Sequence, residues 1–172
     1  VFGAVVDARF VNTGALHVSG LDAQVSYAFD VDDTRVQLGL NGAYLDRYDA
    51  KITPTGATLE RLNVANFPIR FRGRATASAN RGPLTGQVAL NFTNRYRGAL
   101  GQRIDSQVTT DLQLRAEAPE DSGLRGLSAT LNIRNAFDKK PPFYDSPSGA
   151  AYDPGNADVI GRYISLQLVK AW

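Results

Sequence analysis

The segment QVTTDLQLRAE, residues 107–117, alternates between two kinds of side chain along its whole length. Apolar and small residues occupy one parity, at Val108, Thr110, Leu112, Leu114 and Ala116, while the intervening positions are polar or charged. Successive side chains of a β-strand point to opposite faces, so this pattern gives one apolar and one polar face. A one-residue slip would invert both faces. The segment is therefore predicted to be a strand of fixed register.

The same period of two recurs on both sides of this segment, whereas helical periodicity hardly appears. The predicted apolar face of the other strands consists of Leu21, Ala23, Val25, Tyr27 and Phe29; Val36, Leu38, Leu40 and Tyr44; Phe67, Ile69 and Phe71; Val88, Leu90 and Phe92; Leu127, Ala129, Leu131 and Ile133; and Ile164, Leu166 and Leu168. With a weaker strand over Phe2 to Val11, we count about eight strands, joined as an antiparallel up-and-down meander. The predicted fold class is all-β.

The predicted connections alternate between short and long. Tight turns at residues 31–33, 81–83 and 120–123 contain the Gly, Pro, Asp and Ser that favour turns. The other connections are longer, at roughly residues 49–66, 98–103 and 138–158. Alternate connections of a meander lie at the same end of the sheet, so one end is predicted to carry all the long loops. Bacterial outer-membrane barrels have this asymmetry, with short periplasmic turns and long extracellular loops.

Composition excludes several classes of function. The chain has 172 residues, a net charge of +2, no cysteine and one histidine, His17. This length suits one domain, and the small charge does not indicate a nucleic-acid partner. Without cysteine or a second histidine, the chain lacks thiolate nucleophiles and the usual zinc ligand sets. No acid–base pair or phosphate-binding loop is found, so we predict no catalytic residue, no metal site, no cofactor and no enzyme activity.

Aromatic residues of the apolar parity fall into two predicted belts, about one strand length apart. The belt beside the short turns and the C-terminus comprises Tyr27, Phe29 and Trp172. The belt beside the long loops comprises Tyr44, Phe67, Tyr96 and Phe137. Aromatic rings are enriched at both interfaces of a membrane, so the belts favour a transmembrane barrel. A soluble sandwich, in which these rings would form an ordinary core, remains the alternative.

The last predicted strand reads GRYISLQLVKAW, residues 161–172, and ends on an aromatic residue. It resembles the C-terminal strand of outer-membrane barrel proteins, which the barrel-assembly machinery reads as an insertion signal. The resemblance implies that Gly161, Ile164, Leu166, Leu168 and Trp172 form this assembly signal. Lys170 lies on the same face near the end, where its ammonium could reach lipid headgroups.

Three further motifs narrow the resemblance to one family. The segment NIRNAFDKKPPF, residues 132–143, is followed by YDPGNAD, residues 152–158, and by Gly161-Arg162. Near the start, Asn12-Thr-Gly14 leads to Gly20-Leu21-Asp22, and Phe67-Pro68 precedes Arg70 and Arg72. Together these segments resemble the TonB-dependent receptors of the bacterial outer membrane, from about residue 12 to the end of the chain.

The resemblance implies a wall segment of a large transporter barrel with a plugged lumen. It implies energy-coupled uptake of a scarce nutrient of the siderophore, vitamin or oligosaccharide class. The expected partners are membrane lipid, the receptor's own plug domain, the TonB energy-coupling complex and the barrel-assembly machinery. Residues 1–172 are expected to be the C-terminal portion of the barrel, with the plug, the TonB-contacting motif and the signal peptide lying outside them.

Arginines dominate the charge of the predicted polar face. The predicted lumen-facing and plug-facing residues are Arg70, Arg72, Arg74, Arg95, Arg115 and Arg134. They could bond the plug and guide anionic ligands, or be held by local acidic partners and water in a wet barrel interior. Arg70, Arg72 and Arg74 would repel one another on one strand unless an acidic neighbour compensates.

Two other functions remain open from the sequence. The apolar parity could face inward in a soluble β-barrel or sandwich that binds a small apolar ligand. Alternatively, the chain could belong to a small, non-transporting outer-membrane barrel with a structural or adhesive role. Sequence upstream of Val1 would separate the second alternative from a receptor, because a plug domain precedes the barrel in the receptor family.

Overall fold

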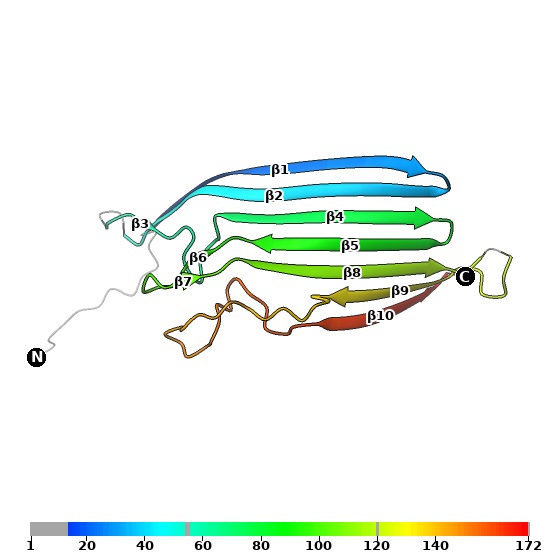
Figure 1. Ribbon diagram of the computed structural model, residues 1–172. Helices are drawn as coiled ribbons and strands as arrows, with labels where there is room; N and C mark the ends of the chain where they lie inside the picture. Colours follow the sequence, from blue (N-terminus) through cyan, green and yellow to red (C-terminus); the bar gives the residue numbers. More distant parts are fainter. Residues whose placement is uncertain (1–13, 54–55, 120, 172) are drawn as a thin grey trace, which may run out of the picture.

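The computed structural model describes residues 14–53, 56–119 and 121–171 of the chain, and these residues form an all-β structure (Figure 1). The weaker strand expected over Phe2 to Val11 lies outside the described residues. The long strands are β1 (Ala15–Val31), β2 (Thr34–Lys51), β4 (Phe71–Arg81), β5 (Leu84–Thr93), β8 (Gln107–Glu117), β9 (Leu127–Arg134) and β10 (Tyr163–Lys170). The described part of the chain contains no helix long and apolar enough to cross a membrane.

The strands pair in chain order into one antiparallel sheet of eight strands, β1-β2-β4-β5-β8-β9-β10, with the short strand β3 (Leu59–Glu60) beside β2. The predicted meander is therefore confirmed. Two further short strands, β6 (Tyr96–Arg97) and β7 (Arg103–Ile104), form a small hairpin within the β5–β8 connection. Among the described residues, β1 and β10 each pair along one edge only, so the sheet is open and does not close on itself.

Within the long strands, the register confirms the predicted faces. Phe67 and Ile69 were predicted on the apolar face as well, but both precede β4, and Ile69 is buried in the connection. Leu112 lies opposite Ile133 and Leu114 opposite Leu131, while Leu131 in turn lies opposite Leu166 of β10. Opposed residues in neighbouring strands point to the same face, so the apolar parity continues across the sheet. The same pairing extends through β5, β4, β2 and β1, which gives one continuous apolar face over seven strands. Much of this face is exposed: Val25 is 65% and Leu166 66% accessible.

All the short turns lie at one end of the sheet and all the long connections at the other (Figure 1). Asp32 and Gly82 turn the β1–β2 and β4–β5 hairpins with positive φ of 49° and 54°. A left-handed backbone in a tight turn suits Gly and is tolerated by Asp. At the opposite end, residues 52–70, 94–106 and 135–162 connect β2 to β4, β5 to β8 and β9 to β10.

Apart from Ala89 of β5, which is 2% exposed, the best-buried apolar side chains lie in these long connections rather than on the long strands. They are Leu62, Ala65, Ile69, Tyr96, Ile104 and Tyr144, each at most 4% exposed. Together with the buried Asp153, we call this cluster the loop layer. It ties the three connections to one another and leaves the apolar face of the sheet uncovered.

Candidate functional site

Amide and hydroxyl side chains cover most of the second face of the sheet, which we call the polar face. On β4, β5, β8 and β9, in that order, its members include Thr76 and Ser78; Thr85, Gln87, Asn91 and Thr93; Gln107, Thr109 and Gln113; and Thr130 and Asn132. The charged residues on the same face of these strands are fewer: Arg72, Arg74, Asp111, Arg115, Glu117 and Arg134. The polar face is therefore a hydrogen-bonding surface more than an ionic one.

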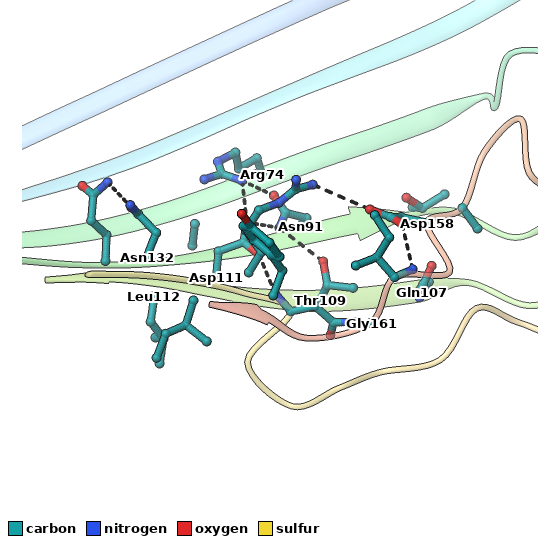
Figure 2. A pocket seen from close by; sticks show the side chains of 18 of the residues that line it. Arg74, Asn91, Gln107, Thr109, Asp111, Leu112, Asn132, Asp158 and Gly161 are labelled. Atoms are coloured by element: carbon teal, nitrogen blue, oxygen red, sulfur yellow. Dashed lines mark hydrogen bonds and ion pairs between the residues drawn. The ribbon is translucent and has the colours of Figure 1, made fainter. Parts of the chain in front are cut away.

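One network of charged and amide groups lies at the centre of the polar face, across β4, β5 and β8 (Figure 2). Arg74 donates from Nη1 to Asp111 Oδ2 at 3.2 Å and also to Asn91 Oδ1. The Asn91 amide donates to Asp111 Oδ2 at 2.8 Å and to Thr109 Oγ1 at 3.2 Å. The backbone N–H of Asn135 donates to the other carboxylate oxygen, Asp111 Oδ1, at 3.0 Å. Arg74 and Asp111 thus neutralise each other within a shared set of hydrogen bonds.

The long β9–β10 connection folds back over the polar face. Arg72 of β4 donates from Nη2 to Asn156 Oδ1 at 2.7 Å. At the end of β9, Arg134 Nη2 lies 3.9 Å from Asp158 Oδ2. These contacts place residues 156–161 opposite the sheet rather than outside it.

Sheet and loop together enclose a trough of about 780 Å³ on the polar face, at its loop end. The polar trough is lined from the sheet by Arg74, Gln87, Asn91, Gln107, Gln113 and Asn132, and from the loop side by Asn156, Asp158 and Tyr163. A second, more open hollow lies beside it over β1, β2, β4 and β5, and Arg74, Asn91 and Thr93 line both.

Asp153 anchors the loop that overhangs the polar trough. It is 1% exposed, and its carboxylate accepts from the backbone N–H of Asn66 at 3.2 Å and of Gly155 at 3.0 Å. The Asn156 side-chain amide donates to the same carboxylate at 2.8 Å and to the Phe67 carbonyl at 3.0 Å. Asp153 therefore fixes Asn156, and with it the roof of the polar trough, to the β2–β4 connection.

Tyr96 lies beside this carboxylate in the loop layer. Burial raises the pKa of the Tyr96 hydroxyl well above its ordinary value of 10.0, and the negative charge and hydrogen bond of Asp153 raise it further. On the other side of the β5–β8 connection, the Tyr144 hydroxyl accepts from the backbone N–H of Ala99 at 3.1 Å. The loop layer is thus bound by buried polar contacts as well as by apolar packing.

The structure places four of the six predicted arginines on the polar face. Arg72, Arg74 and Arg134 have the partners described above. Arg115 pairs with Glu117 on its own strand, with Nη2 2.8 Å from Oε1. The expected repulsion between neighbouring arginines is relieved, because Arg74 lies against Asp111 and Arg72 donates to the side-chain amide oxygen of Asn156.

Arg70 and Arg95 do not join this set, which corrects the prediction for both. Arg70 precedes β4 and donates to the Tyr44 hydroxyl at 3.4 Å, and Tyr44 belongs to the apolar face. Arg95 follows the end of β5 and is exposed in the connection. Strand alternation predicts a side chain's face only while the chain stays in the sheet, and both residues lie beyond the strand ends.

The predicted aromatic belts are placed only in part. Near the short turns, Tyr27 and Phe29 lie on the apolar face with ring centroids 5.6 Å apart. Near the long loops, Tyr44 and Phe137 are exposed, at 43% and 78%. Trp172 lies outside the described residues.

The other two belt residues belong to the loop layer and its surroundings, so they do not lie on the apolar face of the sheet as predicted. Tyr96 is only 4% exposed. Phe67 precedes β4, and its ring centroid lies 6.4 Å from that of Tyr48. The Arg61 guanidinium carbon lies over the Phe67 ring, 5.0 Å from its centroid. Both rings lie on turning backbone outside the long strands, and they pack onto other loops instead of outward.

Three residues expected to form the C-terminal assembly signal share one face of β10. Ile164, Leu166 and Leu168 lie opposite Ile133, Leu131 and Ala129 on the apolar face. Lys170 donates from its ammonium group to the Arg125 carbonyl beside the short β8–β9 connection. Gly161 joins the last loop to β10 with a φ of +76°. The Asp138 carboxylate fills the space beside it and accepts from the Arg162 N–H at 2.9 Å. That hydrogen bond, with the Lys140 ammonium, lowers the pKa of Asp138.

Sequence reasoning missed several residues of this site. The sequence predicts only that Asn91 lies on the polar parity of its strand, yet Asn91 bonds Arg74, Asp111 and Thr109 together. Asp153 and Asn156 lie in the YDPGNAD motif quoted for the family resemblance, but their contacts with the β2–β4 connection and the sheet are not predicted from it. Their position on a turn, YDPGNAD, indicates local hydrogen bonds to the backbone. Nothing local identifies Asn66 as the distant partner, 87 residues away.

Comparison with known proteins adds no family to these observations: no family model matches the chain, and no curated protein and no solved structure matches it.

Proposed function

We propose that this chain forms part of the wall of a TonB-dependent receptor, a barrel of the bacterial outer membrane that takes up a scarce nutrient. The observation that carries the proposal is the two-faced sheet. Seven neighbouring strands present one exposed apolar face and one polar face, with all short turns at one end. Soluble monomers rarely expose a contiguous apolar surface of more than a few hundred Å².

Strand lengths support this placement. β4, β5 and β8 have 11, 10 and 11 residues, and a tilted strand needs about 9–11 residues to cross a bilayer. In the proposed orientation the apolar face contacts lipid and the short turns face the periplasm. The long connections and the loop layer face the outside of the cell.

The proposed barrel supplies what the described sheet lacks. The outer edges of β1 and β10 would pair with further strands of the barrel, because unpaired edges are aggregation hazards that barrels abolish. On the inside, the polar face would contact the plug domain, with Arg72 and Arg115 among the available donors. The polar trough lies at the loop end of this wall, where a nutrient enters.

A pair of single-cysteine variants tests the proposal directly, because the chain has no cysteine of its own. Leu131→Cys and Asn132→Cys are adjacent on β9 and lie on opposite faces. An environment-sensitive fluorophore on the full chain in membrane vesicles should report lipid at position 131 and water at position 132. Two water-exposed labels on a chain that stays monomeric without detergent would overturn the proposal. The same label pattern on a chain that stays monomeric in water without detergent would instead indicate a soluble barrel with its apolar face inward.

The gene upstream of the Val1 codon gives a second, independent test of the receptor family. A plug domain encoded there is the expected result. A signal peptide joined directly to residue 1 would contradict a receptor and favour a small outer-membrane barrel without transport.

A further inference from the structure

The charges that line the polar trough cancel one another. Its two cations, Arg74 and Arg134, lie 3.2 Å and 3.9 Å from Asp111 and Asp158, and the described lining holds no other charged side chain. A site for an anionic ligand keeps its arginine donors free for the ligand, as in phosphate and carboxylate recognition. Here each guanidinium already faces a carboxylate. The trough is therefore matched to a ligand without net charge.

A row of carboxamides runs across the floor of the polar trough. Gln87 of β5 lies opposite Gln113 of β8, which lies opposite Asn132 of β9. Gln113 donates from Nε2 to Asn132 Oδ1 at 2.7 Å, and this leaves the Gln113 oxygen and the Asn132 amino group directed to other partners. Each carboxamide combines an acceptor and two donors. Such a row suits a ligand whose own groups both donate and accept, and hydroxyl groups do so.

The trough also has an aromatic wall and a roof. Tyr163 at the start of β10 lines it with a side chain that is 52% exposed, and its ring offers a flat apolar surface beside the polar floor. Asn156 and Asp158 face the sheet from the overhanging loop, which Asp153 holds in place. The volume of about 780 Å³ falls within the ~300–1,000 Å³ typical of ligand sites, but the lining is mainly amide rather than apolar.

We infer that the polar trough binds a neutral, hydroxyl-rich ligand of the oligosaccharide class. A sugar presents hydroxyls that donate and accept along its edge and a C–H face that packs on an aromatic ring, and it carries no charge. This inference rests on the proposed function, since it names the class of nutrient that the receptor wall would meet on the way in. It also replaces the expectation that the arginines guide an anionic ligand.

The test measures binding of defined sugars by titration calorimetry to the full chain in a phosphocholine detergent, which avoids sugar headgroups. The probes are maltohexaose, cellohexaose and xylohexaose, with the polyanion hexagalacturonate as the charged counterpart. At least one neutral hexasaccharide should bind, with an affinity that does not fall on adding salt. Asn132→Leu should weaken that binding about tenfold, the loss expected for removing a hydrogen-bonding partner. Gln87→Leu should act in the same direction.

Gln37→Leu is the matched control. Gln37 belongs to the same row of the polar face, opposite Ser78, which lies opposite Gln87, but it does not line the polar trough. Its loss should leave sugar binding unchanged. Equal weakening by Gln37→Leu and Asn132→Leu would overturn the inference, as would tight binding of hexagalacturonate without any neutral sugar, or binding of none of the four probes.

The fluorescent labels at positions 131 and 132 separate the two proposals. A lipid-facing label at 131 with no sugar binding overturns the oligosaccharide site and leaves the receptor wall standing. Sugar binding with both labels in water overturns the membrane placement and supports the site.

Discussion

Asp153 shows how much of the loop structure depends on one carboxylate. We expect Asp153→Ala to destabilise the loop layer by about 3 kcal/mol or more. Each buried donor left without an acceptor costs about 1–3 kcal/mol, and this carboxylate accepts from two backbone N–H groups, the Asn156 amide and the Tyr96 hydroxyl. Hydrogen exchange should speed up at the Asn66 and Gly155 amides while the sheet amides stay protected. Asp145→Ala, which removes an exposed carboxylate from the same loop, is the control. Unchanged exchange in Asp153→Ala would contradict the anchoring role.

Tyr96 gives the same cluster a predicted response to alkaline pH. Burial and the nearby Asp153 carboxylate raise the pKa of Tyr96 above 10.0, so the folded state holds this proton more tightly than the unfolded state. The stabilisation is fully present below pH 10 and is lost as the pH rises from there toward the folded pKa. The loop layer should therefore loosen above about pH 10.

Ultraviolet absorbance of tyrosinate, followed alongside hydrogen exchange, measures this step. Tyr96→Phe keeps the ring in the apolar cluster and removes the ionising hydroxyl, so the part of the alkaline step that belongs to Tyr96 should disappear. Ionisation of Tyr96 at its ordinary pKa would show that the hydroxyl is not buried beside Asp153.

At the scale of the elements, the strands and their faces could be predicted because period-2 alternation is a local signal. Leu112 and Leu114 share a parity, and that parity continues through Leu131 and Leu166 because paired strands align side chains on common faces. The short turns could also be predicted, since Asp32 and Gly82 suit a left-handed backbone. The arginines of the long strands, Arg72, Arg74, Arg115 and Arg134, followed from the same alternation.

The connections could not be predicted in the same way, because their structure depends on distant contacts. Phe67 and Tyr96 continue the alternation of adjacent strands on paper, but the strands begin at Phe71 and end at Thr93. Beyond those points the backbone turns, and packing onto other loops decides which way each ring faces. The polar trough was missed for the same reason, since its roof comes from Asn156 and Asp158 of one connection and its floor from β4, β5, β8 and β9.

The junction between the last loop and β10 offers a prediction at this scale. Gly161 has a positive φ, and a Cβ at this position would overlap Asp138 Oδ1, which holds the Arg162 N–H. Gly161→Ala should therefore cost more than the ~1–2 kcal/mol of a left-handed alanine, by about 1 kcal/mol or more for the overlap.

Gly149→Ala is the matched control, because Gly149 has a similar φ of +79° and open space where the Cβ would lie. On a gel run after heating the samples to increasing temperatures, the folded chain runs as a compact band. The midpoint temperature at which this band is lost should fall further for Gly161→Ala than for Gly149→Ala. Equal shifts would mean that Asp138 moves aside without loss.

For the whole molecule, the sheet and the loop layer differ in how far their side chains are buried, and this difference indicates their separate roles. The sheet buries few of its own side chains and presents an apolar face to one side and an amide-rich face to the other. The loop layer supplies the tightly packed core at one end and carries the roof of the polar trough. A wall between lipid and water, with its binding surface at the loop end, makes use of each of these features.

The orientation of that wall predicts how a single charge affects insertion. Leu166 lies midway along β10 on the apolar face, opposite Leu131, and is 66% exposed. Leu166→Arg would place a guanidinium among lipid tails, at a cost of about 2–4 kcal/mol near the bilayer midplane. Gln167→Arg puts the same charge one residue away on the polar face, opposite Thr130, where water is available. The fraction of inserted chain, measured by heat-modifiable gel mobility, should fall more than tenfold for Leu166→Arg and stay near that of the unaltered chain for Gln167→Arg. Normal insertion of Leu166→Arg together with loss for Gln167→Arg would mean that the apolar face is turned away from lipid.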